Sequence, residues 1–554
     1  MIRTDTLSCV SRRENLGDEG ENVFTRRASG LVRVLSPTDS ILTNIMATGG
    51  IGFTLSYFVL WATGISGGGL TTIVLAMVIA CLGCAAQGLM FAMFGATMPR
   101  AGGDYLYASR VIHPAVGFMS NSAMAFWLIW NVSWGCFTFS SIGLVTIFGA
   151  LGSVTGNQGF TNLSASFGTT DWAVVAATVF LGFGSIFVIG RLKNFLRIQL
   201  LIAVVGFISL AAIIIVLAVT SVGEFSHTYN QFMQGQGAGP DTYSTVIDDA
   251  SRFGFNSGAR VTTSALMLAI PFASFNFFWT FCSTYLTGET KNVKKTQIVG
   301  MVGSNFVILG LSLVIIVLLF NAVGYDFIAS LGYLYQYQPD AYPVGSPAPW
   351  FYVFPLMMIK NPAILLLVGF GFVLWAYWWA NQNLLFSVRC VFSWSVDKLI
   401  PQKFSQVSTR THTPLFTTII LIALSFIMIL MFAYLPKTAI ISGILGISIP
   451  PYVLSIAGMM LPYKRKDLYE KSPVRWTFLG IPVIVIISAI TFLFDNYVFY
   501  YFLTDPTLGV IPGNTFAFFI LPLPAAVVYF YFARWWRRKE GIDIDLAYKS
   551  IPLE

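Results

Sequence analysis

The sequence predicts an all-α integral membrane protein with twelve transmembrane helices. Only 10% of its 554 residues are Asp, Glu, Lys or Arg, 56% belong to the hydrophobic set, and the mean hydropathy is +0.73. Soluble domains carry roughly 25% charged residues, so this chain has too few charges to cover a water-exposed surface. Its apolar residues form continuous runs, which predict helices and exclude the alternating pattern of a membrane β-barrel.

Each predicted span is an apolar run of the length that a helix needs to cross the hydrocarbon core, about 20 residues. Helices are expected because backbone groups inside a bilayer must find their hydrogen-bond partners within the segment. The first six runs lie near 39–62, 68–97, 114–150, 171–190, 195–222 and 260–286. The other six lie near 297–325, 361–392, 414–434, 437–461, 475–500 and 511–535.

The positive charges divide unequally between the two sides of this arrangement. With the N-terminus inside, the inner segments hold 28 of the 32 Lys and Arg residues and the outer segments hold 4, since 28 + 4 = 32. Cytoplasmic loops of membrane proteins carry such an excess of Lys and Arg. We therefore expect the protein in the plasma membrane, with the N-terminal tail (1–38) and the C-terminal tail (536–554) both in the cytoplasm. Long outer loops are predicted at 223–259 and 326–360.

The sequence lacks the motifs of several protein classes. It has no His-Glu-x-x-His, Walker or Ser/His/Asp pattern in its spans, and no potassium-channel filter sequence. The six cysteines and three histidines form no metal-binding set, and the basic residues lie between apolar runs rather than on a nucleic-acid-binding face. We therefore expect no enzyme, metal, cofactor or nucleic-acid partner. The remaining class is a transporter of a small solute, with a channel-like or sensing protein as the alternative.

Two spans contain interruptions of the kind that transporters use to bind solutes near the middle of the membrane. In the first span, Thr48 is followed by Gly49, Gly50, Ile51 and Gly52. Each glycine in a helix interior costs about 1 kcal/mol, so this cluster favours an unwound segment. Close packing of helices on small residues is the other interpretation.

The sixth span has a matching interruption around Pro271, which removes a backbone donor and disfavours helix at the residue before it. The residues that follow are Phe272, Ala273, Ser274, Phe275 and Asn276, two of them polar in an apolar stretch. Interruptions at corresponding positions of two halves indicate inverted repeats with a binding site between them. The halves would be 39–222 and 260–461, joined by the outer loop 223–259 and followed by two additional helices within 462–535.

Four motifs resemble those of the amino acid–polyamine–organocation superfamily. They are Gly49-Gly50-Ile51-Gly52, the segment from Pro99 through Gly102-Gly103 to Tyr105 and Tyr107, Gly288-Glu289-Thr290-Lys291-Asn292, and the Arg389…Asp397…Pro401 spacing. This resemblance implies the leucine-transporter fold of five plus five helices with two more, in which the backbone at both breaks binds an amino acid. The chain departs from the family pattern at Asn276-Phe277-Phe278 and at Lys398.

The substrate-binding residues expected from the breaks and from span three are Thr48, Gly49, Gly50, Ile51, Gly52, Phe272, Ala273, Ser274, Phe275, Asn276 and Asn131. The middle of spans one, three, six and eight carries no charged side chain. Because an unpaired charge inside a membrane is costly, this absence favours a neutral amino acid with an apolar or aromatic side chain. A polyamine or another small organic solute remains an alternative.

The ion that would drive transport is left open by the sequence. A sodium site would draw oxygen ligands from span one and span eight, with Ala47, Asn381 and Asn383 as candidates. A proton relay needs a titratable group at depth, and Asp495 is expected near the interface in the outer part of span eleven. Exchange of one amino acid for another would need no ion, and the oligomeric state is not predicted.

Overall fold

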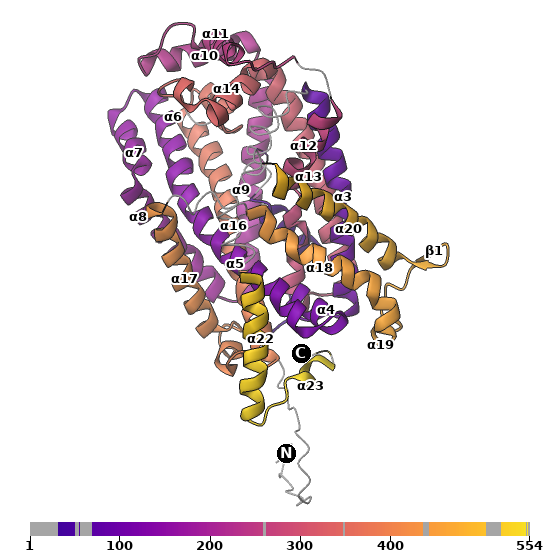
Figure 1. The fold of residues 1–554 in the computed structure, drawn as a ribbon. Coiled ribbons are helices and arrows are strands. Elements are labelled where there is room, and N and C mark those ends of the chain that lie inside the picture. Colours follow the sequence, from indigo (N-terminus) through magenta and orange to yellow (C-terminus); the bar gives the residue numbers. More distant parts are fainter. Residues whose placement is uncertain are drawn as a thin grey trace, which may run out of the picture.

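The structure is a computed structural model, and it describes residues 31–49, 55, 69–258, 262–346, 349–435, 443–505, 522–549 and 551. The described part is mostly helical, as predicted (Figure 1). It departs from the all-α prediction in one short hairpin, β1 (Thr477–Phe478) and β2 (Ile481–Pro482), which pair antiparallel.

The helices of the first half follow the predicted spans closely from residue 69 onward. They are α1 (Pro37–Ala47), α3 (Gly69–Thr97), α4 (Asp104–Val111), α5 (Pro114–Thr138), the π-helix η1 (Phe139–Leu144), α6 (Val145–Thr155), α7 (Gln158–Gly168), α8 (Thr170–Ile189), α9 (Leu192–Val219), α10 (Val222–Gly235) and α11 (Thr242–Arg252). Several starts are set by the sequence, because Pro37, Pro114 and Pro362 each stand in the first turn behind a capping side chain.

The second half contains the longest helix and several short ones. Its elements are α12 (Thr263–Ser274), the 3₁₀ helix η2 (Phe278–Glu289), α13 (Val293–Val323), α14 (Tyr325–Tyr337), η3 (Pro339–Ala341), α15 (Val353–Met358), α16 (Pro362–Val396), η4 (Gln402–Ser405), α17 (Leu415–Tyr434), α18 (Gly443–Lys464), α19 (Lys466–Tyr469), α20 (Val483–Thr504), α22 (Pro522–Lys539) and α23 (Asp545–Lys549).

Within the described residues, nine helical segments are long and apolar enough to cross a membrane. They correspond to predicted spans two to nine and eleven, and two of them are composite, α5–η1–α6 and α12–η2. The first and last predicted spans are described only in part, by α1 and α22, and α18 covers most of the tenth. The count of twelve and the division into two five-helix repeats therefore remain predictions.

Both long loops predicted to lie outside contain helices. α10 and α11 fall in the loop at 223–259, while α14 and α15 fall in the loop at 326–360, and α10, α11 and α14 lie together at one end of the bundle (Figure 1). Tyr243 of α11 stacks on Phe327 of α14 with ring centroids 4.3 Å apart, and its hydroxyl donates to the carbonyl of Val323. These contacts make a packed cap on the bundle.

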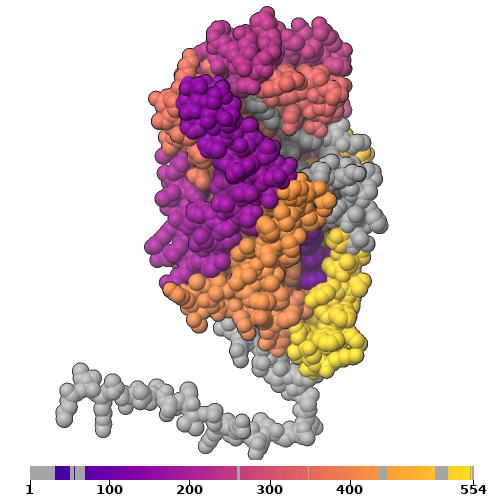
Figure 2. All heavy atoms as spheres, turned by 90° about the vertical axis from the view of Figure 1, so that its left-hand side faces the viewer, coloured from indigo at the N-terminus to yellow at the C-terminus, as the bar shows by residue number. Residues whose placement is uncertain are grey.

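The flank of the bundle presents apolar side chains to its surroundings. Figure 2 shows one such face, where purple α8 and orange α17 lie side by side. Val179, Ile186, Ile419 and Ile427 on these two helices are all more than half exposed. A contiguous exposed apolar face of this kind is suited to contact with lipid.

Candidate functional site

The first span is interrupted where the glycine cluster begins. α1 opens with a capping box between Ser36 and Asp39 and ends at Ala47. The hydroxyl of the fully buried Thr48 donates to the carbonyl of Ile45 at 2.6 Å, and Gly49 has φ +75°, which a residue with a side chain rarely adopts. The helix thus stops inside the protein at the predicted place. Gly50, Ile51 and Gly52 lie outside the described residues.

The sixth span is interrupted later than Pro271. α12 continues through this proline to Ser274, and the chain turns at Phe275–Phe277 before it resumes as the tighter helix η2. Pro271 cannot donate to the carbonyl four residues earlier, that of Met267, and the hydroxyl of Tyr497 on α20 donates to this carbonyl instead. This replacement partner lets the helix pass the proline, so the break is displaced to the Phe272–Asn276 region that was expected to bind substrate.

Asn276 lies at this second break, fully buried. Its side-chain nitrogen donates to the carbonyl of Ala273 at 3.2 Å and to the sulfur of Met77 at 3.8 Å, while its Oδ1 has no hydrogen-bond partner among the described residues. Ser274 is also buried, and its hydroxyl donates back to the carbonyl of Ile270. The break therefore offers one unsatisfied acceptor at the point where the backbone leaves the helix.

The two interrupted spans are joined by a buried polar network that sequence reasoning did not identify. Asn44 of α1 donates to the hydroxyl of Ser283 at 3.1 Å and accepts from its backbone nitrogen at 2.9 Å. The hydroxyl of Ser283 in turn donates to Gln297 of α13 at 2.7 Å. One polar side chain in each of three apolar spans was the available signal, but nothing in the sequence pairs them.

Of the three residues proposed as ion ligands, the two on α16 point to different sides of that helix. Asn381 of α16 packs against Gly184 of α8 so tightly that no Cβ would fit there. Gln382 of α16 points toward α1, and its side-chain nitrogen donates to the carbonyl of Thr43 at 3.2 Å. Asn381 and Asn383 are two positions apart on one helix and so face different sides. Ala47 ends α1 as a buried residue.

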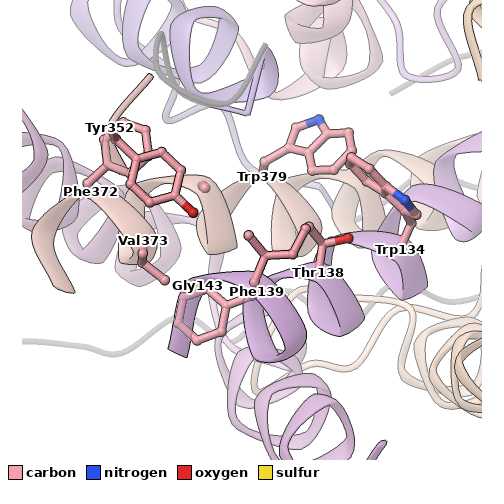
Figure 3. A pocket seen from close by; sticks show the side chains of 11 residues that line it. Trp134, Thr138, Phe139, Gly143, Tyr352, Phe372, Val373 and Trp379 are labelled. Atoms are coloured by element: carbon pink, nitrogen blue, oxygen red, sulfur yellow. The ribbon is translucent and has the colours of Figure 1, made fainter. Parts of the chain in front are cut away.

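An apolar pocket lies between α5, η1 and α16 (Figure 3). Trp134 and Trp379 lie together at one end of it, and Tyr352 lies with Phe372 at the other (Figure 3). The ring of Trp379 also meets that of Trp279, on the first turn of η2, edge to face at 5.7 Å between centroids. This aromatic contact connects the pocket to the segment that follows the second break.

Asn131 and Asn383 stand one turn from this pocket on two helices that pack against each other. Asn131 precedes Trp134 by three positions on α5, and Asn383 follows Trp379 by four on α16, so each shares a helix face with a pocket residue. Both are buried, and the Nδ2 of Asn131 and the Oδ1 of Asn383 have no partner among the described residues. A donor and an acceptor thus lie close to the aromatic end of the pocket.

Comparison with known proteins now decides the family. A family model described as amino acid permease matches residues 40–524. The chain belongs to the amino acid permease family. This is a family of transporters within the amino acid–polyamine–organocation superfamily, and membership points to amino acid transport by a multi-pass membrane protein. A search of the curated proteins found no matching relative.

The permease's Gly102-Gly103 motif is explained by its packing. Both glycines have positive φ, +109° and +52°. A Cβ on Gly102 would lie 2.6 Å from the Cβ of Ser393 on α16, and one on Gly103 would lie 2.9 Å from side-chain atoms of Thr284 and Tyr285 on η2. The motif therefore places α4 directly against α16 and η2.

Two buried ion pairs join α16 to η2 and to α4. Arg389 of α16 holds Glu289, at the end of η2, with its Nε 2.7 Å from the carboxylate. Arg110 of α4 holds Asp397, at the end of α16, also at 2.7 Å. The next residue, Lys398, takes the place of the usual family glycine in spite of its φ of +60°. The four charges of these two pairs neutralise one another.

Asp104 of α4 is a further buried carboxylate in the permease. It accepts hydrogen bonds from Asn121 and Ser120 of α5 and from the hydroxyl of Tyr285, at 2.8, 3.0 and 2.9 Å. Burial raises its pKa to about 6, against the opposing effect of these three donors. Asn121 thus uses its side-chain amide to hold this carboxylate.

Asp495, which was expected near the interface in the outer part of span eleven, points into the protein rather than outward. It is fully buried on α20 and accepts a hydrogen bond from Gln87 of α3. It faces inward because Ser488 and Thr491, three and four positions apart along the same helix face, are buried with it. The sequence shows this polar stripe but does not show which neighbouring helix covers it.

Proposed function

We propose that this permease moves neutral amino acids with apolar or aromatic side chains across the plasma membrane by alternating access. The observation that carries the proposal is the pair of buried breaks, at Thr48–Gly49 after α1 and at Phe275–Phe277 after α12. The carbonyl ends of α1 and α12 suit the ammonium group of an amino acid, and the N–H groups at the start of η2 suit its carboxylate.

The surroundings of the second break support an apolar side chain. The rings of Trp279 and Trp379 are in edge-to-face contact, and the pocket next to Trp379 is lined mainly by aromatic and aliphatic groups. No Asp, Glu, Lys or Arg is among the residues that line it. A charged substrate side chain would be left without a partner there, which is costly in a site of low polarity.

A polyamine is the competing solute, because the described membrane helices contain, besides the ion-paired Glu289, the buried carboxylate of Asp495. This group belongs to α20, which packs against α3, α12 and α18, and it does not line the aromatic pocket. Uptake into proteoliposomes of a panel of labelled amino acids and putrescine separates the two. Saturable counterflow of a neutral amino acid supports the proposal, and counterflow of putrescine alone overturns it. Counterflow also distinguishes a carrier from a channel or a sensor.

The role of the first break is tested by replacing its left-handed glycine. Gly49→Ala forces a side chain into φ +75°, a strain of about 1–3 kcal/mol, so we expect counterflow of the transported amino acid to fall about tenfold or more. Gly156→Ala is the matched control, since Gly156 has φ +64° but nothing within 4 Å of the added Cβ. Equal counterflow in both variants would show that the break does not serve the substrate.

A further inference from the structure

The buried carboxylate of Asp495 lies near the middle of α20. It is the thirteenth residue of a 22-residue helix, about 18 Å from its first residue at 1.5 Å per residue. Its Oδ1 accepts from the amide of Gln87 on α3, and neither residue is more than 1% exposed. An ionisable group at such a depth is expensive to retain and marks functional sites in membrane proteins.

Among the described residues, no cation faces this carboxylate from the elements packed against α20. Those elements are α3, α12, α18 and β2, with Phe278 of η2 also touching Phe494. α3, α12 and β2 carry no charged residue, α18 carries only its terminal Lys464, and Glu289 of η2 is already paired with Arg389. The titratable groups that remain are weak: Cys81 and Cys84 of α3, Cys282 and Tyr285 of η2, Tyr452 and Tyr463 of α18, and Tyr497, Tyr500 and Tyr501 of α20 itself. Without a counter-charge at this depth, the neutral carboxylic acid has a lower free energy than the charged carboxylate.

A row of unsatisfied oxygens leads along α20 to this group. The Oδ2 of Asp495, the Oγ1 of Thr491 and the Oγ of Ser488 have no hydrogen-bond partner among the described residues, nor has the Oε1 of Gln87. Ser488 lies near the Val483 end of the helix, against Gly458 of α18, where an added Cβ would lie 1.9 Å from its hydroxyl. The three α20 residues share one face and continue the row over two turns.

The shape of this row favours a proton over a metal ion. A bound metal ion needs its oxygen ligands around one point, at about 2.0–2.6 Å. Ser488 and Asp495 are seven residues apart, which places them about 10 Å apart along the helix axis. Hydroxyls spaced in this way can pass a proton through water molecules that bridge them, but they cannot enclose one ion.

The same stretch of α3 connects Asp495 to the second break. Cys84 precedes Gln87 by three positions and approaches the carbonyl of Ser274, the last residue of α12, at 4.0 Å. Further along α3, the sulfur of Met77 accepts from Asn276. A shift of α3 when the carboxyl gains or loses its proton would therefore reach the end of α12.

We propose that Asp495 is the proton-binding site through which this permease couples amino acid uptake to a pH gradient. For uptake with the N-terminus in the cytoplasm, the proton comes from water on the outer side, forms an O–H bond on Oδ2, and leaves toward the cytoplasm along the Thr491–Ser488 row when the transporter changes conformation. This proposal rests on the proposed transport function, and it adds the ion that drives it.

The test separates coupling from transport in proteoliposomes. Counterflow, which needs no gradient, should remain within about threefold of wild type in Asp495→Asn, while accumulation driven by an imposed pH gradient should fall about tenfold or more. Asp505→Asn, the same change at the end of α20, is the matched control and should keep gradient-driven accumulation. Thr491→Val should slow it, because the row would lose a hydroxyl.

Three outcomes would overturn this proposal without touching transport itself. They are wild-type counterflow with no response to a pH gradient, an unchanged response in Asp495→Asn, and an infrared spectrum of the purified protein that shows no protonated carboxyl band dependent on Asp495. The infrared measurement needs no substrate. Wild-type protein without counterflow for any amino acid would instead refute the proposed function, and the spectrum would still decide whether Asp495 binds a proton.

Discussion

At the scale of single residues, Asp104 combines full burial with three hydrogen-bond donors and no facing cation that offsets its desolvation. Its pKa of about 6 lies above the ordinary value of 3.8, so the folded state holds the proton more tightly than the unfolded state between these two pH values. The stabilisation from the bound proton is complete below about pH 4 and is lost as the pH rises through 6.

We therefore expect the permease to lose stability between about pH 4 and 6, by as much as ~3 kcal/mol from this group. Asp104→Asn should remove that part of the pH dependence, because the amide does not titrate. The measurement is the melting temperature of the detergent-solubilised protein across this pH range. An equally steep loss of stability in Asp104→Asn would assign the effect to other groups.

The sequence showed which residues could form the site, but it did not show toward which neighbouring helix each side chain points. Thr48 and Gly49 were predicted at the first break because adjacent glycines are costly in a helix whatever surrounds them. Asn381, Asn383 and Asp495 were harder, because an asparagine or aspartate in an apolar run has no partner until the neighbouring helices are placed. The structure turns Asn381 to α8 and buries Asp495 against α3.

At the scale of elements, proline was a less dependable signal than glycine. Pro271 predicted the place of the second break, yet α12 runs three residues past it because Tyr497 satisfies the freed carbonyl of Met267. That tyrosine is more than 200 residues away in the chain, so no local pattern contains it. The extent of the outer helices α10 and α11 was missed for a related reason, since their packing on α14 is also non-local.

The contact between α1 and α13 depends on Gly300. A Cβ there would lie 1.9 Å from the hydroxyl of Ser40 and 3.2 Å from its carbonyl carbon, so α1 itself must move to admit a methyl group. We expect Gly300→Ala to destabilise the protein by about 1–3 kcal/mol. Gly303→Ala, on the same helix with nothing within 4 Å, should leave stability unchanged or slightly raised. Melting temperatures of the two variants in detergent provide the comparison, and equal values would show that α1 and α13 are not held at this distance.

At the scale of the whole molecule, the ends of distant segments meet beside α4. Tyr105 of α4 hydrogen-bonds Tyr548 of α23 at 3.0 Å between the hydroxyls, and Arg110 donates to the carbonyl of Ala547 at 3.3 Å. The C-terminal tail, predicted at 536–554 as a cytoplasmic extension, thus packs against the same short helix that carries the glycine motif. Because α4 also holds Asp397 and contacts η2, this region connects the tail to α16 and to the second half of the interrupted sixth span.

The orientation that the charges of the chain predict can be tested by labelling. Val344, in the loop between α14 and α15, and Leu479, in the turn between β1 and β2, are 87% and 86% exposed. They lie on opposite sides of the membrane if the N-terminus is cytoplasmic. In a Cys9→Ser background, a membrane-impermeant maleimide should label Val344→Cys on intact cells and Leu479→Cys only after permeabilisation, since the five other cysteines are buried. Labelling of Leu479→Cys on intact cells would reverse the topology and, with it, the side to which the Ser488 row opens.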